Sequence, residues 1–144
     1  MRSGTTATLA ALIGSIWATT ALAWTDADGD FVRGYEDNCL LHANGPNELA
    51  PQRDADFDGY GDACDPDYDN DGFTTTSDFL IFLDSFEMIA PTLLTDHSGN
   101  GATTTEDFLV FLEFFVNGNA PPGPSGLACA GTVPCPPTWV PDDL

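Results

Sequence analysis

The chain has 144 residues, and its 23 aspartate and glutamate residues face only three basic residues, for a formal charge of −20. A surface this acidic is a poor partner for nucleic acid or an anionic membrane, and without counter-ions it destabilises its own fold by repulsion. Either the chain stays disordered or a cation neutralises it, and divalent cations suit that task.

The first 23 residues have the pattern of a secretory signal peptide. Arg2 gives a short positive region, an apolar run begins at Ala7, and residues 21–23 (Ala-Leu-Ala) form a small-residue cleavage site. A membrane anchor is the alternative, but the apolar run is short and is interrupted by glycine, serine and threonine. We therefore expect a mature chain that begins near Trp24 and is secreted or held at the cell surface, with no later segment long enough to span a bilayer.

Four cysteines follow: Cys39, Cys64, Cys129 and Cys135. An exported chain meets an oxidising compartment where cysteines tend to pair, and three pairings are possible in principle. We favour Cys39 with Cys64, which would bracket one aspartate-rich loop, and Cys129 with Cys135, which would clip the tail. Structural zinc is the alternative, but the C-x-x-C and histidine spacings that it needs are absent.

Aspartate recurs in the same register four times, in loop one (26–37), loop two (54–65), loop three (67–78) and loop four (96–107). A calcium loop needs side-chain oxygens at positions 1, 3 and 5, a backbone carbonyl at position 7, a carboxylate at position 12 and glycine at position 6. The predicted ligands of the first two loops are Asp26, Asp28, Asp30, the Val32 carbonyl and Asp37, then Asp54, Asp56, Asp58, the Tyr60 carbonyl, Asp62 (position 9) and Asp65. Those of the last two are Asp67, Asp69, Asp71, the Phe73 carbonyl and Asp78, then Asp96, Ser98, Asn100, the Ala102 carbonyl and Asp107.

Calcium fits these loops better than magnesium, because protein oxygens supply most of the coordination shell. Position 12 is always aspartate, so the following helix must approach the ion more closely than it would with the longer glutamate. Loop one has Phe31 where the others have glycine. Loop four has Ser98 and Asn100 in place of two carboxylates, so we expect it to bind calcium most weakly. The sequence predicts about three to four calcium ions.

Residues 24–66 show little apolar periodicity and resemble the thrombospondin type 3 repeat. The resemblance rests on residues 37–39 (Asp-Asn-Cys), on Gln52, and on residues 61–65 (Gly-Asp-Ala-Cys-Asp) after the second aspartate run. It implies a backbone that wraps calcium ions with almost no hydrophobic core, and a Cys39–Cys64 disulfide. Phe31 at the glycine position and a longer segment over residues 42–51 depart from the family pattern.

Residues 67–117 contain a duplication. The segments FTTTSDFLIFLDSF (73–86) and ATTTEDFLVFLEFF (102–115) match position by position at an offset of 29 residues. Each has apolar residues at i, i+3, i+4 and i+7, which predicts a helix that begins where its loop closes. Two short helices must bury something, so we expect a shared core of Phe79, Phe82, Phe86, Phe108, Phe111 and Phe115. The alternative is that some of the other apolar side chains form an exposed patch for a partner.

A duplicated loop followed by a helix resembles the type I dockerin module. The resemblance implies two units packed about a pseudo-twofold axis and a cohesin-like partner that contacts Thr76, Ser77, Thr105 and Glu106. Thr74 and Thr103 depart from it, since that loop position is usually aliphatic in dockerins. The expected fold is small and mostly α: an irregular, disulfide-linked calcium-loop segment followed by two loop–helix units.

Residues 118–144 are dense in proline and glycine, which predicts an extended, mobile tail. We expect no enzymatic activity, because nearly all carboxylates are assigned to metal and neither histidine accompanies a recognisable nucleophile motif. The leading hypothesis is a secreted calcium-binding protein whose dockerin-like module binds another extracellular protein. The alternative is a structural or matrix spacer that calcium makes rigid, with no specific partner.

Overall fold

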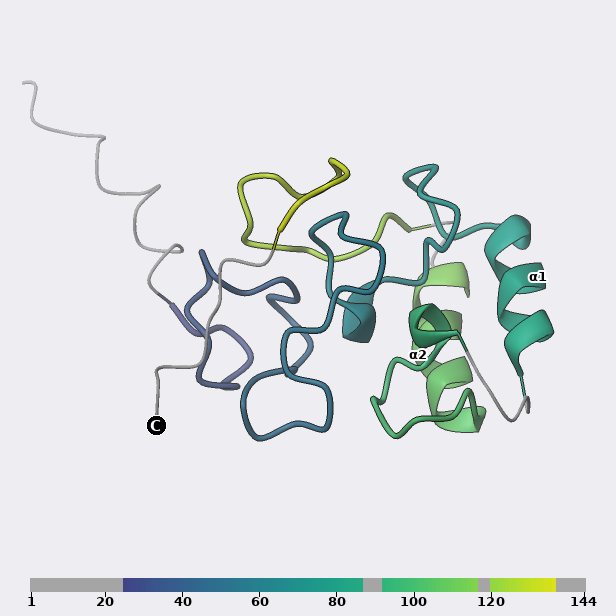
Figure 1. Ribbon diagram of the computed structural model, residues 1–144, viewed down its shortest axis with the longest axis horizontal. Helices are drawn as coiled ribbons and strands as arrows, with labels where there is room; N and C mark the ends of the chain where they lie inside the picture. The colour runs from purple at the N-terminus through teal and green to yellow at the C-terminus, as the bar shows by residue number, and fades with distance from the viewer. Residues whose placement is uncertain (1–24, 87–91, 117–119, 137–144) are drawn as a thin grey trace, which may run out of the picture.

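A computed structural model describes residues 25–86, 92–116 and 120–136 (Figure 1). Within these ranges the regular structure consists of helix α1 (Thr76–Ser85), helix α2 (Thr105–Val116) and two short 3₁₀ turns, η2 (Asp62–Cys64) and η3 (Leu93–Thr95), with no strand. The expected fold class, helical with irregular calcium-type loops, is confirmed. No described helix is long and apolar enough to cross a membrane, and the predicted signal peptide lies outside the described residues.

Both α-helices begin at the point where a loop closes. Thr75 caps α1: its hydroxyl accepts from the Ser77 N–H, and the Asp78 carboxylate accepts from the Thr75 N–H at 2.7 Å. Thr104 and Asp107 repeat this arrangement at the start of α2, again with an N–H to carboxylate bond of 2.7 Å. Such reciprocal capping satisfies backbone donors that the first helical turn leaves free. The duplication in sequence is therefore a duplication of local structure.

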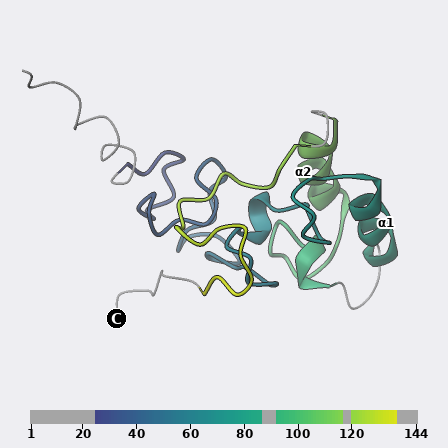
Figure 2. The same cartoon turned by 90° about the horizontal axis from the view of Figure 1, so that it is seen from above.

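The helices pack through their phenylalanines, as expected. Phe82 and Phe111 are fully buried with ring centroids 5.6 Å apart, and Phe79 and Phe108 flank them. Tyr68 from loop three stacks on Phe111 at 6.1 Å. Burying a side chain of this size contributes about 2 kcal/mol. These rings form the hydrophobic core at the helical end of the molecule, while loops fill the other end (Figure 2).

The loop-rich end is held by a disulfide and a polar network. Cys39 and Cys64 are bonded, as favoured from the sequence, and both are fully buried. Gln52 is also buried. Its side-chain oxygen Oε1 accepts from the Asn38 N–H at 2.8 Å, and its side-chain Nε2 donates to the Asp37 carboxylate at 3.0 Å. The disulfide packs against Phe114 of α2. The two predicted units therefore share contacts.

The C-terminal segment differs from its prediction. Composition predicted an extended, mobile tail, but residues 120–136 lie along the loop-rich end in both views (Figures 1 and 2). The Gly126 N–H donates to the Asp37 carbonyl and the Gly131 N–H to the Asp58 carbonyl, each at 2.8 Å. The predicted Cys129–Cys135 disulfide is present. The proline and glycine residues here allow the chain to follow the surface of the loop-rich end closely. Composition by itself does not reveal this packing.

Candidate metal-binding loops

The first carboxylate of every loop is held in the same way. One of its oxygens accepts the backbone N–H of position 6, which curls the chain around the carboxylate. The bonds are Phe31 to Asp26 at 3.0 Å, Gly59 to Asp54 at 2.9 Å, Gly72 to Asp67 at 2.7 Å and Gly101 to Asp96 at 3.0 Å. Four loops predicted from one spacing rule therefore share one backbone geometry.

Each loop also turns through the left-handed region twice, at positions 4 and 6. At position 6 the φ angles are 75° for Phe31, 92° for Gly59, 93° for Gly72 and 89° for Gly101. At position 4 they are 82° for Gly29, 63° for Phe57, 57° for Asn70 and 73° for Gly99. The left-handed conformation at position 4 was not predicted, although glycine and asparagine, which tolerate it, occupy this position in three loops.

Replacing Phe31 with glycine is expected to stabilise the protein by about 1 kcal/mol, because a β-carbon is strained in the left-handed region. Its ring is 74% exposed, so little packing is lost. Urea unfolding at saturating calcium measures the change. Phe31→Ala removes the same ring but keeps the β-carbon, so it should give no gain. An equal gain from alanine would show that ring exposure, and not backbone strain, is the cost at this position.

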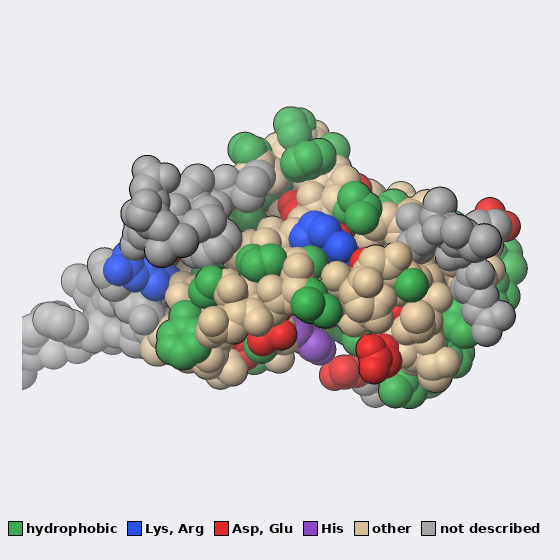
Figure 3. Space-filling model, turned by 60° about the horizontal axis from the view of Figure 1, so that its bottom comes forward, with side chains coloured by type: hydrophobic (Ala, Val, Ile, Leu, Met, Phe, Trp, Pro, Cys, Tyr) green, Lys and Arg blue, Asp and Glu red, His purple; other side chains and the backbone are tan. Residues whose placement is uncertain are grey.

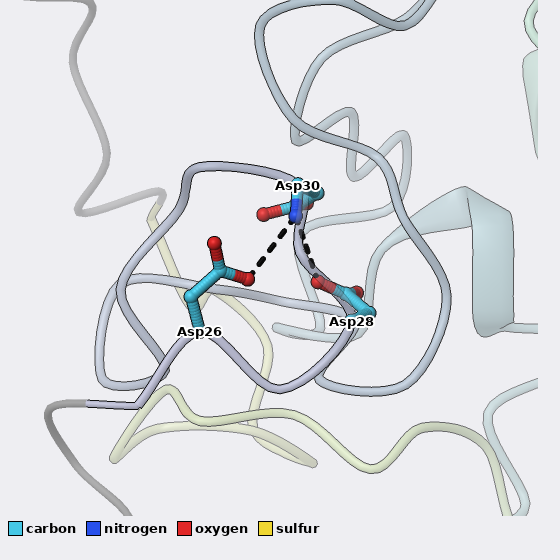
Figure 4. Close-up of side chains that lie close together, drawn as sticks. All are labelled: Asp26, Asp28 and Asp30. Atoms are coloured by element: carbon cyan, nitrogen blue, oxygen red, sulfur yellow. Dashed lines mark hydrogen bonds between the residues drawn. The ribbon is translucent and has the colours of Figure 1, made fainter.

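The side chains at positions 1, 3 and 5 converge in the first three loops. In each, the three aspartates offer oxygens that lie within 4.8 Å of one another. Figure 4 shows Asp26, Asp28 and Asp30 turned toward a common centre, with the Asp30 N–H donating to Asp26 at 3.1 Å and to Asp28 at 3.3 Å. Carboxylates gathered this closely suit a hard cation such as calcium, which takes six to eight oxygen ligands.

Loop one carries a further sign that a cation fits. One oxygen of Asp28 and one of Asp37 are buried without a hydrogen-bond partner. Asp37, the predicted position 12, is 1% exposed, and burial raises its pKa, to which the nearby Asp30 and Asp26 carboxylates add. A buried carboxylate oxygen without a donor is costly unless an ion binds it. The residues present therefore fit a divalent cation.

Position 12 closes loops three and four in matching fashion. Asp78 accepts from the Asp69 N–H at 3.3 Å, and Asp107 accepts from the Ser98 N–H at 2.8 Å. Each of these two carboxylates is fully buried and also caps its helix. Loop geometry and helix initiation thus depend on the same side chain.

Loop two has contacts beyond those that its register predicts. Asp62, predicted at position 9, is bonded to the Arg53 guanidinium and accepts from the Ala55 N–H at 2.9 Å. Asp65, predicted at position 12, is buried between loops two and three, where burial and the neighbouring Asp58 carboxylate raise its pKa well above its ordinary value. The Asp65 carboxylate therefore adds negative charge near both loop two and loop three.

The position 7 residues make the same contact in all four loops. Each position 7 residue donates its N–H to the side chain of position 5, which leaves its carbonyl as the candidate ligand. These bonds are Val32 to Asp30 at 2.7 Å, Tyr60 to Asp58 at 2.8 Å, Phe73 to Asp71 at 3.0 Å and Ala102 to Asn100 at 2.9 Å. Asp56 accepts from Asn70 of loop three at 2.8 Å, which ties these two loops together.

In several aspartates, burial and repulsion between neighbouring carboxylates disfavour the ionised form. Burial, with repulsion from neighbouring aspartates, raises the pKa of Asp28, Asp58 and Asp67 to about 6 in each case, and that of Asp54 to about 7. Basic side chains are scarce: Figure 3 shows two small basic patches, and at the helical end hydrophobic side chains lie beside acidic ones. The loops therefore concentrate negative charge that a bound cation would neutralise.

These shifts predict an unusual pH dependence for the calcium-free protein. A carboxylate whose folded pKa is about 6, against 3.8 when unfolded, contributes stability below about pH 4 that is lost as pH rises through 6. The urea midpoint in calcium-free buffer should therefore fall between pH 4 and pH 7. With saturating calcium it should rise over the same range, because the ion needs ionised ligands. Parallel curves would contradict this electrostatic account.

Two important residues were missed from the sequence. His97 is buried: one ring nitrogen contacts the Asp62 carbonyl and the other lies 2.7 Å from the Tyr68 hydroxyl. Arg53 contacts both Asp62 and loop four. Neither residue occupies a ligand position of the loop register, and only the fold brings Arg53 and His97 to the same place. The predicted partner-binding residues Thr76, Ser77, Thr105 and Glu106 are all exposed, at the first turns of the two α-helices.

Comparison with known proteins gives one family match. The model of the thrombospondin type 3 repeat, a calcium-binding repeat of extracellular proteins, matches residues 53–79. This range covers loops two and three and the first turn of α1, so it crosses the boundary predicted at residue 66. No match was found among curated proteins or among solved structures.

Proposed function

We propose that the protein is a secreted calcium-binding protein whose loops one to four each hold a calcium ion. The shared loop geometry carries this proposal: position 1 accepts from position 6 in all four loops, and three aspartate triads converge. The proposed ligands are those predicted from the register, and two of them, Asp62 and Asp96, also contact Arg53. The family match over residues 53–79 supports the same chemistry.

We expect calcium binding to drive the folding of this protein. The carboxylates of the calcium-free loops repel one another, so the binding energy of the ions becomes folding energy. The family matched over residues 53–79 is not a catalytic one, and the loop carboxylates are engaged in backbone hydrogen bonds that shape the loops. The proposed role is therefore binding, not catalysis.

Circular dichroism of the calcium-stripped protein, titrated with calcium and separately with magnesium, tests this role. We expect a saturable gain of helix with calcium at roughly 10⁻⁴ to 10⁻³ M, the range of extracellular modules. Equal magnesium should give much less, since it demands a tight octahedron and retains its waters. A helical spectrum that is the same with and without calcium would overturn the proposal.

We further propose that the helical end binds another extracellular protein, as the dockerin resemblance implies. Exposed Leu80 of α1 and Leu109 of α2 occupy equivalent positions in the duplicated units, 62% and 63% exposed, beside the polar first turns. Paired exposed leucines on so acidic a protein favour a docking role over the spacer alternative. The spacer alternative draws its support from residues 120–136, which lie along the loops and donate backbone hydrogen bonds to them.

Calcium-dependent, saturable binding to a purified secreted protein separates these roles. A Thr105→Ala/Glu106→Ala variant should weaken that binding at least tenfold, and Leu109→Ala should act in the same direction. Glu48→Ala, on the exposed surface of the loop-rich end, is the matched control and should leave it unchanged. A spacer would show no saturable partner and would tolerate all three variants.

A further inference from the structure

Arg53 lies where the loop-rich end meets loop four. Its guanidinium contacts the Asp62 carboxylate of η2 and the carbonyl oxygen of Asp96, and it donates to Asp96 Oδ2 and to the Leu93 carbonyl at 3.3 Å each. The Arg53 side chain is mostly buried, and Asp96 is fully buried. The positively charged guanidinium of Arg53 is therefore held against position 1 of loop four by two carboxylates and two backbone carbonyls.

The two oxygens of Asp96 have different surroundings. Oδ2 accepts from the Gly101 N–H at 3.0 Å and from Arg53, whereas Oδ1 accepts from the Asn100 N–H at 3.1 Å and from the Ser98 hydroxyl at 3.4 Å. Both oxygens thus accept backbone N–H groups of loop four, and the Arg53 guanidinium contacts the carboxylate at Oδ2.

In loop three the equivalent position 1 carboxylate, that of Asp67, provides the comparison with Asp96. Asp67 accepts from the Gly72 N–H at 2.7 Å and from the Asp71 N–H at 3.1 Å. No arginine or lysine of the described ranges forms an ion pair with it. The backbone alone therefore orients a position 1 aspartate. What Arg53 adds to loop four is chiefly a positive charge.

We infer that Arg53 sets the calcium affinity of loop four, by opposing the ion with a fixed charge held against Oδ2 of Asp96. This inference rests on the proposed calcium-binding function. A divalent ion bound by the same carboxylate would repel this guanidinium, and we expect the repulsion to weaken binding about tenfold. Loop four also has only two carboxylates to attract the ion, so this repulsion is a large fraction of the local field.

The consequence is a coupling between the two ends of the molecule. Arg53 holds η2 and loop four together, and His97 does the same through the Asp62 carbonyl. Coupling between two binding events is reciprocal, so an ion at loop four must weaken the hold of Arg53 on Asp96. Loop four is therefore the last loop to fill, and its filling loosens the contact between the ends.

Nuclear magnetic resonance of the full chain, titrated with calcium, resolves the loops one by one. The position 6 amides of Gly59, Gly72 and Gly101 each donate to the first carboxylate of loops two, three and four, so each reports its own loop. Three variants are compared with the natural chain: Arg53→Gln removes the charge, Arg53→Lys keeps it, and Arg33→Gln removes an equal charge elsewhere. Arg33 lies in loop one, where it donates to the Tyr35 hydroxyl at 3.1 Å.

Arg53→Gln should tighten calcium binding at Gly101 about tenfold, while Arg53→Lys and Arg33→Gln leave it unchanged. The inference is overturned if glutamine and lysine give the same Gly101 affinity, or if Gly101 never responds while Gly59 and Gly72 do. If no glycine amide responds, the proposed calcium-binding function itself fails. If Arg53→Gln does not fold, Asp62→Asn replaces it: this variant leaves the guanidinium less neutralised and should weaken binding at Gly101, and an unchanged affinity counts against the inference.

Discussion

Asp78→Ala is expected to remove calcium binding from loop three and to unfold the start of α1 in one step. The Asp78 carboxylate is fully buried and accepts from the Asp69 and Thr75 N–H groups, so it closes the loop and caps the helix together. Loss of a cap costs about 1–2 kcal/mol. Loss of a charged ligand adds to this, because the ion then contributes less to folding.

Two further variants separate these effects. Asp78→Asn keeps an acceptor oxygen for the helix cap but loses the charge, so it should retain more helix than alanine while still binding calcium poorly. Asp84→Ala, on an exposed position of the same helix, should change stability by less than about 0.5 kcal/mol. Helix content by circular dichroism and the Gly72 amide titration give the two readouts. Intact calcium binding in Asp78→Ala would exclude this residue as a ligand.

Removing the Cys39–Cys64 disulfide is expected to cost the most stability of any covalent change. The bond spans 25 residues, and closing a loop of that length stabilises a fold by about 3.5 kcal/mol in the chain-entropy model. Both sulfurs are buried beside Phe114, so serine hydroxyls there would add a desolvation cost. The Cys39→Ser/Cys64→Ser variant should therefore unfold at much lower urea, even with saturating calcium.

The second disulfide provides the comparison. Cys129–Cys135 spans only six residues, for which the same model gives about 2 kcal/mol. Its loss should free residues 120–136 from loop two, where Cys135 donates to the Phe57 carbonyl, and leave the Phe79–Phe108 core intact. Equal losses for the two double variants would mean that packing, not loop length, decides what each disulfide contributes.

The backbone geometry of the loops was predictable because it is local. Positions 1 to 12 of a loop are consecutive residues, so the alternating aspartates and the glycine specify the loop conformation without contacts from distant residues. Phe31 illustrates how strong this is: the loop adopts φ of 75° there although the residue disfavours it. The helices are equally local, since each capping pair lies three residues apart and the phenylalanines recur on one face.

What the sequence by itself determined is therefore the loops, the two helices, their phenylalanine core and the favoured cysteine pairs. Only the tertiary structure decided the partners of Arg53, the burial of His97 and the return of residues 120–136 over loop two. The Arg53–Asp96 contact joins residues 43 apart in sequence, and the Ser125–Gly59 contact joins residues 66 apart. Periodicity and spacing describe neighbours along the chain, whereas such contacts form only after packing has brought distant segments together, so no local pattern specifies them.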